Sequence, residues 1–74
     1  MIIYLEILEK LSEEETLTRQ PQQFRREVSS RDEALDLYER VKPFFEGVSY
    51  VARIHYCRHD EGKPCETEEI EETP

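Results

Sequence analysis

The sequence contains no asparagine, and it has only two glycines, two cysteines and one methionine. Two glycines far apart leave no glycine-rich loop that could serve as an oxyanion hole. The two cysteines are eight positions apart, so CxxC spacing is absent, and so is HExxH. No constellation of catalytic residues stands out, and we therefore expect a protein that is not an enzyme.

Long apolar runs are also missing. No stretch approaches the roughly 20 residues that a membrane-spanning helix needs. The first residues, MIIYLEIL, carry no basic start and no cleavage site of a signal peptide. We expect a cytoplasmic protein that does not bind membranes. The lack of asparagine and of internal methionine, with abundant glutamate and arginine, is typical of thermophile proteins.

Basic residues are scarce relative to acidic ones. The chain has 10 lysines and arginines against 18 acidic residues, for a net charge of −8. Such a surface repels phosphate backbones, which disfavours nucleic-acid binding. The acidic residues gather at positions 13–15 and 66–72. Three interpretations of these acidic clusters stay open. They keep the protein soluble, they attract a basic partner or a cation, or they mimic nucleic-acid charge and so block a nucleic-acid-binding protein.

A chain of 74 residues makes one small domain. It buries only roughly 60% of its unfolded surface, and burial then barely exceeds the loss of chain entropy. Hydrophobic residues make up 36% of the chain, which is enough for a folded core. A cross-link, a metal or a second copy of the chain would add stability.

The hydrophobic pattern predicts an α+β fold with the order β-β-α-β-β. We expect a single-layer, mainly antiparallel sheet with one helix packed on one face. The strands are predicted at residues 2–11, at 16–28 with an interruption at Pro21, at 48–58 and at 65–70, with the helix at 30–45. The domain covers residues 1–70, and residues 71–74 form a frayed acidic tail. The predicted core comprises Ile3, Leu5, Ile7, Phe24, Val28, Leu37, Tyr38, Val41, Phe44, Tyr50, Ala52, Ile54 and Tyr56.

The helix has clear signals at both ends. Ser30 can accept a hydrogen bond from the backbone of Glu33, whose side chain can reach back to the backbone of Ser30. Pro43 and Gly47 mark the end, since proline disrupts helical geometry and glycine supplies a left-handed cap. Either Phe44 or Phe45 completes the apolar stripe.

The first strand is apolar on both faces. Ile3, Leu5 and Ile7 share one face, and the other carries Ile2, Tyr4 and Leu8. One helix covers only one side, so we expect a second copy of the chain over Ile2, Tyr4 and Leu8. The leading functional hypothesis is a non-enzymatic interaction module that binds a protein partner or forms a homodimer.

The region VSYVARIHYCRHDEGKPC holds both cysteines and both histidines. Alternation places Tyr50, Ala52 and Ile54 on one face and His55, Cys57 and His59 on the other. Residues 60–62, Asp-Glu-Gly, match a hairpin turn with glycine in the left-handed position, and this turn puts Cys57 opposite Cys65.

Three interpretations of this hairpin stay open. The cysteines are two reduced thiols, a cross-strand disulfide, or ligands of a metal such as zinc together with His55 or His59. Along an extended strand the two histidines would be roughly 13 Å apart, so only one could join the cysteines. A fourth ligand would come from Asp60 or a partner chain. The first expectation is no cofactor, with zinc as the alternative in a metal- or redox-responsive protein.

Overall fold

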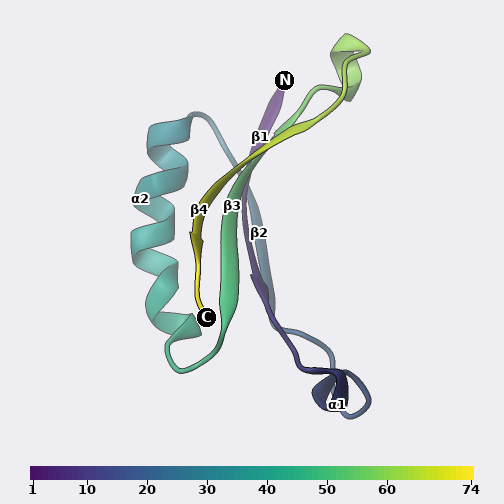
Figure 1. The fold of residues 1–74 in the computed structure, drawn as a ribbon. Helices are drawn as coiled ribbons and strands as arrows, with labels where there is room; N and C mark the ends of the chain where they lie inside the picture. Colours follow the sequence, from purple (N-terminus) through teal and green to yellow (C-terminus); the bar gives the residue numbers. More distant parts are fainter.

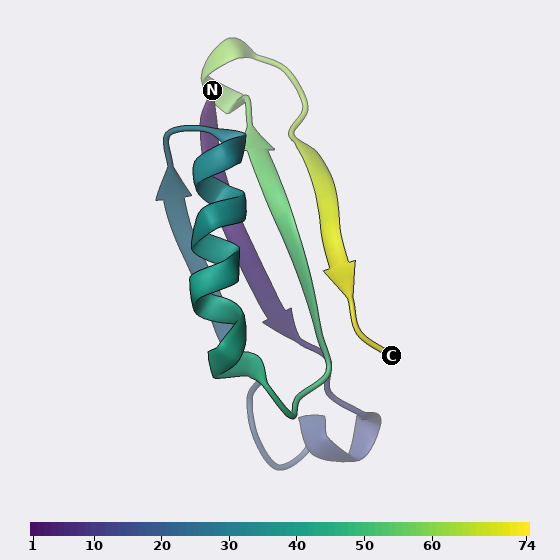
Figure 2. The same cartoon turned by 90° about the vertical axis from the view of Figure 1, so that its left-hand side faces the viewer.

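The computed structural model describes all 74 residues and contains a four-stranded antiparallel sheet with one long helix over one face (Figures 1 and 2). The sheet order is β2-β1-β3-β4. The elements are β1 (Ile2–Glu9), α1 (Glu13–Thr16), β2 (Gln23–Val28), α2 (Arg31–Val41), the 3₁₀ turn η1 (Lys42–Phe45), β3 (Tyr50–Cys57), the 3₁₀ turn η2 (His59–Glu61) and β4 (Glu66–Glu72). The predicted α+β class and the helix on one face are confirmed.

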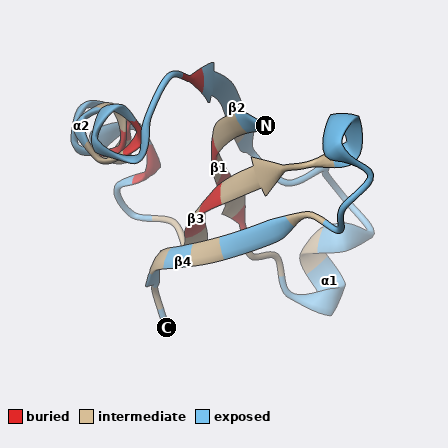
Figure 3. Cartoon of the chain, turned by 90° about the horizontal axis from the view of Figure 1, so that it is seen from above, coloured by how far each residue is buried: buried red, intermediate tan, exposed pale blue.

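The core lies between α2 and the sheet. Figure 3 shows the buried positions on the sides of α2 and of the strands that face each other. Leu5, Ile7 and Ile54, from the two central strands, are completely buried. The buried hydrophobic residues are Leu5, Ile7, Val28, Ala34, Tyr38, Val41, Phe45, Tyr50, Ala52 and Ile54. The alternation predicted for β1 and β3 therefore holds, and the opposite face of the sheet is open.

One predicted core residue is wrong: Phe44 is 77% exposed, whereas Phe45 is 2% exposed. Both positions fit the apolar stripe of the preceding helix, so spacing alone does not separate them. The α-helix ends at Val41, and η1 turns the chain toward β3. In this turn the Phe45 ring packs 5.8 Å from the Tyr50 ring, between ring centroids. A contact between η1 and β3 thus decides which phenylalanine is buried.

One of the two capping contacts predicted at the start of α2 is confirmed, and the other involves a different donor. The Ser30 hydroxyl accepts a hydrogen bond of 3.1 Å from the Glu33 N–H. The Glu33 carboxylate accepts from the Ser29 N–H at 2.8 Å, one residue before the expected donor. Both contacts satisfy N–H groups near the helix start that have no partner inside the helix.

The segment between β1 and β2 differs from the strand that was predicted to begin at residue 16. The chain forms α1 here, with a complete capping box in which Ser12 and Glu15 bond each other's backbone N–H groups at 3.2 and 3.1 Å. Acidic side chains in its first turn suit the positive end of the helix dipole. The capping signal of the Ser-x-x-Glu pattern therefore outweighs the strand propensity of the β-branched Thr16.

Glu9 ties this segment to the sheet. Its side chain is only 4% exposed and accepts two hydrogen bonds from the Arg19 guanidinium, at 2.8 and 2.6 Å, and one from the Gln22 N–H at 2.9 Å. These contacts lower the pKa of Glu9 from 4.5 to about 2, because they stabilise the charged carboxylate.

The expected frayed tail also differs, because β4 continues to Glu72. Glu71 and Glu72 pair with Ala52 and Val51, after a register shift between Ala52 and Arg53. Thr73 donates its N–H to the Tyr50 carbonyl at 2.9 Å. The sheet thus includes residues that the sequence analysis excluded, since backbone pairing tolerates a run of glutamates on an edge strand. No helix of the fold is long and apolar enough to cross a membrane.

Candidate metal centre

The hairpin of β3 and β4 brings both cysteines to one end of the sheet. Tyr56 pairs with Glu66 and His55 with Thr67, so the next step of this register brings Cys57 level with Cys65, as predicted. The strands stop there, and residues 58–65 form a loop containing η2. Gly62 has φ 68°, the left-handed conformation expected for this turn.

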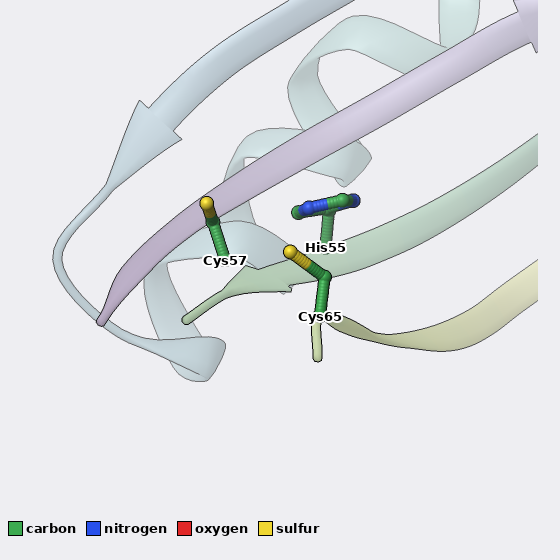
Figure 4. Close-up of side chains that lie close together, drawn as sticks. All are labelled: His55, Cys57 and Cys65. Carbon is green, nitrogen blue, oxygen red and sulfur yellow. The ribbon is translucent and has the colours of Figure 1, made fainter. Parts of the chain in front are cut away.

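Three of the predicted ligands lie together on the open face. Figure 4 shows His55 and Cys57 projecting from the same side of β3, with the Cys65 side chain directed toward them. A ring nitrogen of His55 and the two sulfur atoms all lie within 4.8 Å of one another. Each of these residues is half-buried, and both cysteines are free thiols.

His59 also lies beside the two thiols, in contrast to the prediction that only one histidine could join the cysteines. Its Nδ1 lies 3.4 Å from Cys57 Sγ, and its Nε2 lies 3.5 Å from Cys65 Sγ. The separation of roughly 13 Å from His55 assumed a strand that extends through His59. The strand ends at Cys57 instead, and η2 turns the His59 ring back over the thiols. Both imidazoles therefore lie beside the same two sulfurs.

These distances are compatible with sulfur and nitrogen ligands around one metal ion. Tetrahedral zinc, with Zn–S near 2.3 Å and Zn–N near 2.0–2.1 Å, separates a sulfur and a nitrogen ligand by about 3.5 Å. A single ion takes one nitrogen of His59, and Nδ1 lies 3.4 Å from Cys57 Sγ and 4.0 Å from Cys65 Sγ. His55 would need to approach the thiols by little more than about 1 Å for the same geometry. Two thiols therefore lie beside two imidazoles, which are the donor types of a Cys₂His₂ site.

Glu6 of β1 contacts His55 from the other side. Its Oε1 lies 3.7 Å from His55 Nδ1, and this carboxylate also pairs with Arg25 at 2.9 Å and Arg53 at 3.1 Å. The Glu6 side chain is only 13% exposed. Histidines that bind metals commonly present their second nitrogen to a carboxylate, which orients the ring. The contact is made at Nδ1, so a metal bound through Nε2 of His55 would leave it in place.

This role of Glu6 is not apparent in the sequence. Its two ion-pair partners lie on different strands, Arg25 on β2 and Arg53 on β3. Glu6 lies directly opposite both arginines because β1 runs between β2 and β3. The strand order was the missing information, and no local pattern around Glu6 supplies it.

The structure does not bring Asp60 into the cluster. Its Oδ2 lies 3.1 Å from the amino-terminal ammonium group of Met1. This contact holds the pKa of the Asp60 carboxyl below its ordinary value, because the positive charge stabilises the carboxylate. His59 is the better candidate for the fourth position.

The expected interface residues lie on the same open face. The Arg25 guanidinium carbon stacks 3.9 Å from the centre of the Tyr4 ring, and the Tyr4 ring meets the His55 ring edge-on. Ile2 is 38% exposed, whereas Leu8 is half-buried. Charged side chains thus cover part of this face, and self-association through Ile2, Tyr4 and Leu8 stays a prediction.

Comparisons with known proteins give no match: no family model, no curated protein and no solved structure is similar to this chain.

Proposed function

We propose that this is a small metal-binding protein that holds one zinc ion between Cys57, Cys65, His59 and His55. The observation that carries the proposal is the position of His59, whose Nδ1 lies 3.4 Å from Cys57 Sγ and 4.0 Å from Cys65 Sγ. His55 completes the cluster from β3, within 4.8 Å of the same sulfurs.

The types of ligand atom in the cluster favour one kind of metal ion. Two thiolates and two imidazoles in a tetrahedral arrangement favour zinc, whereas magnesium and calcium prefer oxygen ligands. The net charge of −8 also attracts cations to the protein. A site whose four ligands all come from the chain has no open position, which is typical of structural zinc sites.

Such an ion would stabilise the loop of residues 58–65. The loop of residues 58–65 carries no buried residue, and η2 is its only regular structure. An ion bound by Cys57, His59 and Cys65 would cross-link the start of this loop to its end. At free zinc 100 times the dissociation constant, binding to the folded state alone adds about 2.7 kcal/mol of stability. That is a large fraction of the stability of a chain this short.

The test is native mass spectrometry of the untagged protein, purified without chelator, combined with zinc titration against a chromophoric chelator. We expect one zinc per chain. Cys57→Ser and Cys65→Ser should abolish tight binding, and His59→Ala should weaken it strongly. Asp60→Asn is the matched control, since it changes a neighbouring loop residue outside the cluster and should keep full affinity.

Two results would contradict the proposal. One is the absence of zinc binding at micromolar concentrations of the reduced protein. The other is zinc binding that Asp60→Asn reduces and Cys57→Ser leaves unchanged, since that pattern would place the ion on the carboxylates of the loop.

A further inference from the structure

The two thiols of the cluster face each other across the hairpin. The pairs Tyr56–Glu66 and His55–Thr67 set the register, and Cys57 and Cys65 occupy its next step. Residues directly opposite in an antiparallel pair have Cα atoms about 4.5–5.5 Å apart, within the range that a disulfide spans. The sulfur atoms lie within 4.8 Å of each other, so side-chain rotation suffices to join them.

The thiols are also reachable by a small oxidant. Cys57 and Cys65 are half-buried free cysteines, and the His59 ring beside them is exposed. The neighbouring loop residues 60–64 are exposed as well. A tripeptide disulfide can therefore approach the sulfurs without opening the core between α2 and the sheet.

We propose that Cys57 and Cys65 are a reversible disulfide pair, closed by a low-molecular-weight disulfide such as oxidised glutathione, and that closure releases the bound zinc. The disulfide follows from the hairpin geometry alone, whereas the release of zinc rests on the proposed function. Disulfides in cytosolic proteins are usually transient and redox-sensing, which agrees with a reversible pair.

The reaction is thiol–disulfide exchange in two steps. One cysteine thiolate attacks a sulfur of oxidised glutathione, the S–S bond of that molecule breaks, and one glutathione thiolate leaves. The second cysteine thiolate then attacks the cysteine sulfur of the mixed disulfide and displaces the second glutathione. The pair loses two electrons, oxidised glutathione gains them, and the two thiol protons end on the two glutathione products.

Zinc and the disulfide exclude each other at this site. Zinc binds cysteine as a thiolate, and a sulfur within a disulfide no longer offers that negative charge. Loss of two of the four ligands leaves only His55 and His59. Bound zinc, in turn, occupies the thiolates that would attack the oxidant. At free zinc about ten times the dissociation constant, the metal-free fraction falls to about a tenth, so oxidation should slow about tenfold.

The experiment exposes the full-length, untagged protein to oxidised glutathione, once metal-free and once zinc-loaded. Intact mass records the loss of two hydrogens, and a fluorescent zinc indicator records released metal. We expect an intramolecular disulfide in the metal-free protein, oxidation slowed about tenfold by zinc, and release of one zinc per disulfide formed. Reduction with dithiothreitol should restore both thiols and zinc binding.

Two variants separate the steps. Cys57→Ser should stop at a stable glutathione adduct on Cys65, because no second thiol resolves it. His59→Ala keeps both thiols and should still close the disulfide, but the same free zinc should no longer slow the reaction.

The failures are distinguishable from one another. Separate glutathione adducts on both cysteines, or disulfides between chains, would overturn the redox proposal and leave zinc binding intact. A disulfide that closes at the same rate with zinc, in a protein that binds none, would overturn the proposed function and the release step together.

Discussion

Glu6→Gln tests whether the carboxylate beside His55 orients this proposed zinc ligand. The side chain is 13% exposed, and Oε1 lies 3.7 Å from His55 Nδ1. Loss of such a partner typically weakens metal binding by 10- to 100-fold, or about 1.4–2.7 kcal/mol. The arginine partners of Glu6 have side chains 54% and 38% exposed, and exposed ion pairs are worth about 0–1 kcal/mol each. The free energy of unfolding of the metal-free protein should therefore change by less than about 2 kcal/mol.

The assay is zinc competition with a chromophoric chelator, together with the visible absorption of the cobalt-substituted protein and the ¹⁵N NMR signals of His55. We expect weaker binding, an altered cobalt spectrum and a less uniform His55 tautomer. Glu27→Gln is the matched control, because Glu27 is exposed on the neighbouring strand and makes no ion pair. Equal zinc affinity and an equal His55 signal in the two variants would refute the positioning role of Glu6.

The remaining predictions concern the fold. Leu5→Ala should destabilise the protein by about 2.7–5 kcal/mol in a urea unfolding experiment, because Leu5 is completely buried. Leu17→Ala, at a residue that is 86% exposed, should change stability by less than about 0.5 kcal/mol, and equal losses would contradict the assigned core. Unfolding measured against pH should show full stability from Glu9 above pH 4.5 and a progressive loss toward pH 2, since its pKa is lowered from 4.5 to about 2 in the folded state. Arg19→Gln should flatten this acid dependence, and an unchanged acid limb would argue against the Glu9 contact. Gly62→Ala should cost about 1–2 kcal/mol in thermal unfolding, because φ is 68° while nothing lies within 4 Å of the added Cβ, and an unchanged midpoint would mean that this turn relaxes freely.

Several features of this protein follow from local sequence alone. The alternation of Tyr50, Ala52 and Ile54 identifies the core face of β3, because side chains of a strand point to opposite faces in turn. Ser30 marks the start of α2, because its hydroxyl satisfies a backbone donor three residues away. The glycine at position 62 identifies the hairpin turn and hence the register that sets Cys57 opposite Cys65. Each signal involves residues within one element or one turn.

Other features depend on contacts between different elements of the fold. The order β2-β1-β3-β4 places Glu6 between Arg25 and Arg53 and beside His55, which no pattern within β1 indicates. Packing against Tyr50 selects Phe45 over Phe44 for the core. Sequence alone therefore determined α2, the central strands with their inward faces, and the candidate ligands. Tertiary structure decided which side chains meet, including both histidines at one pair of thiols, because strand order and the end of a strand depend on packing energy summed over the whole chain.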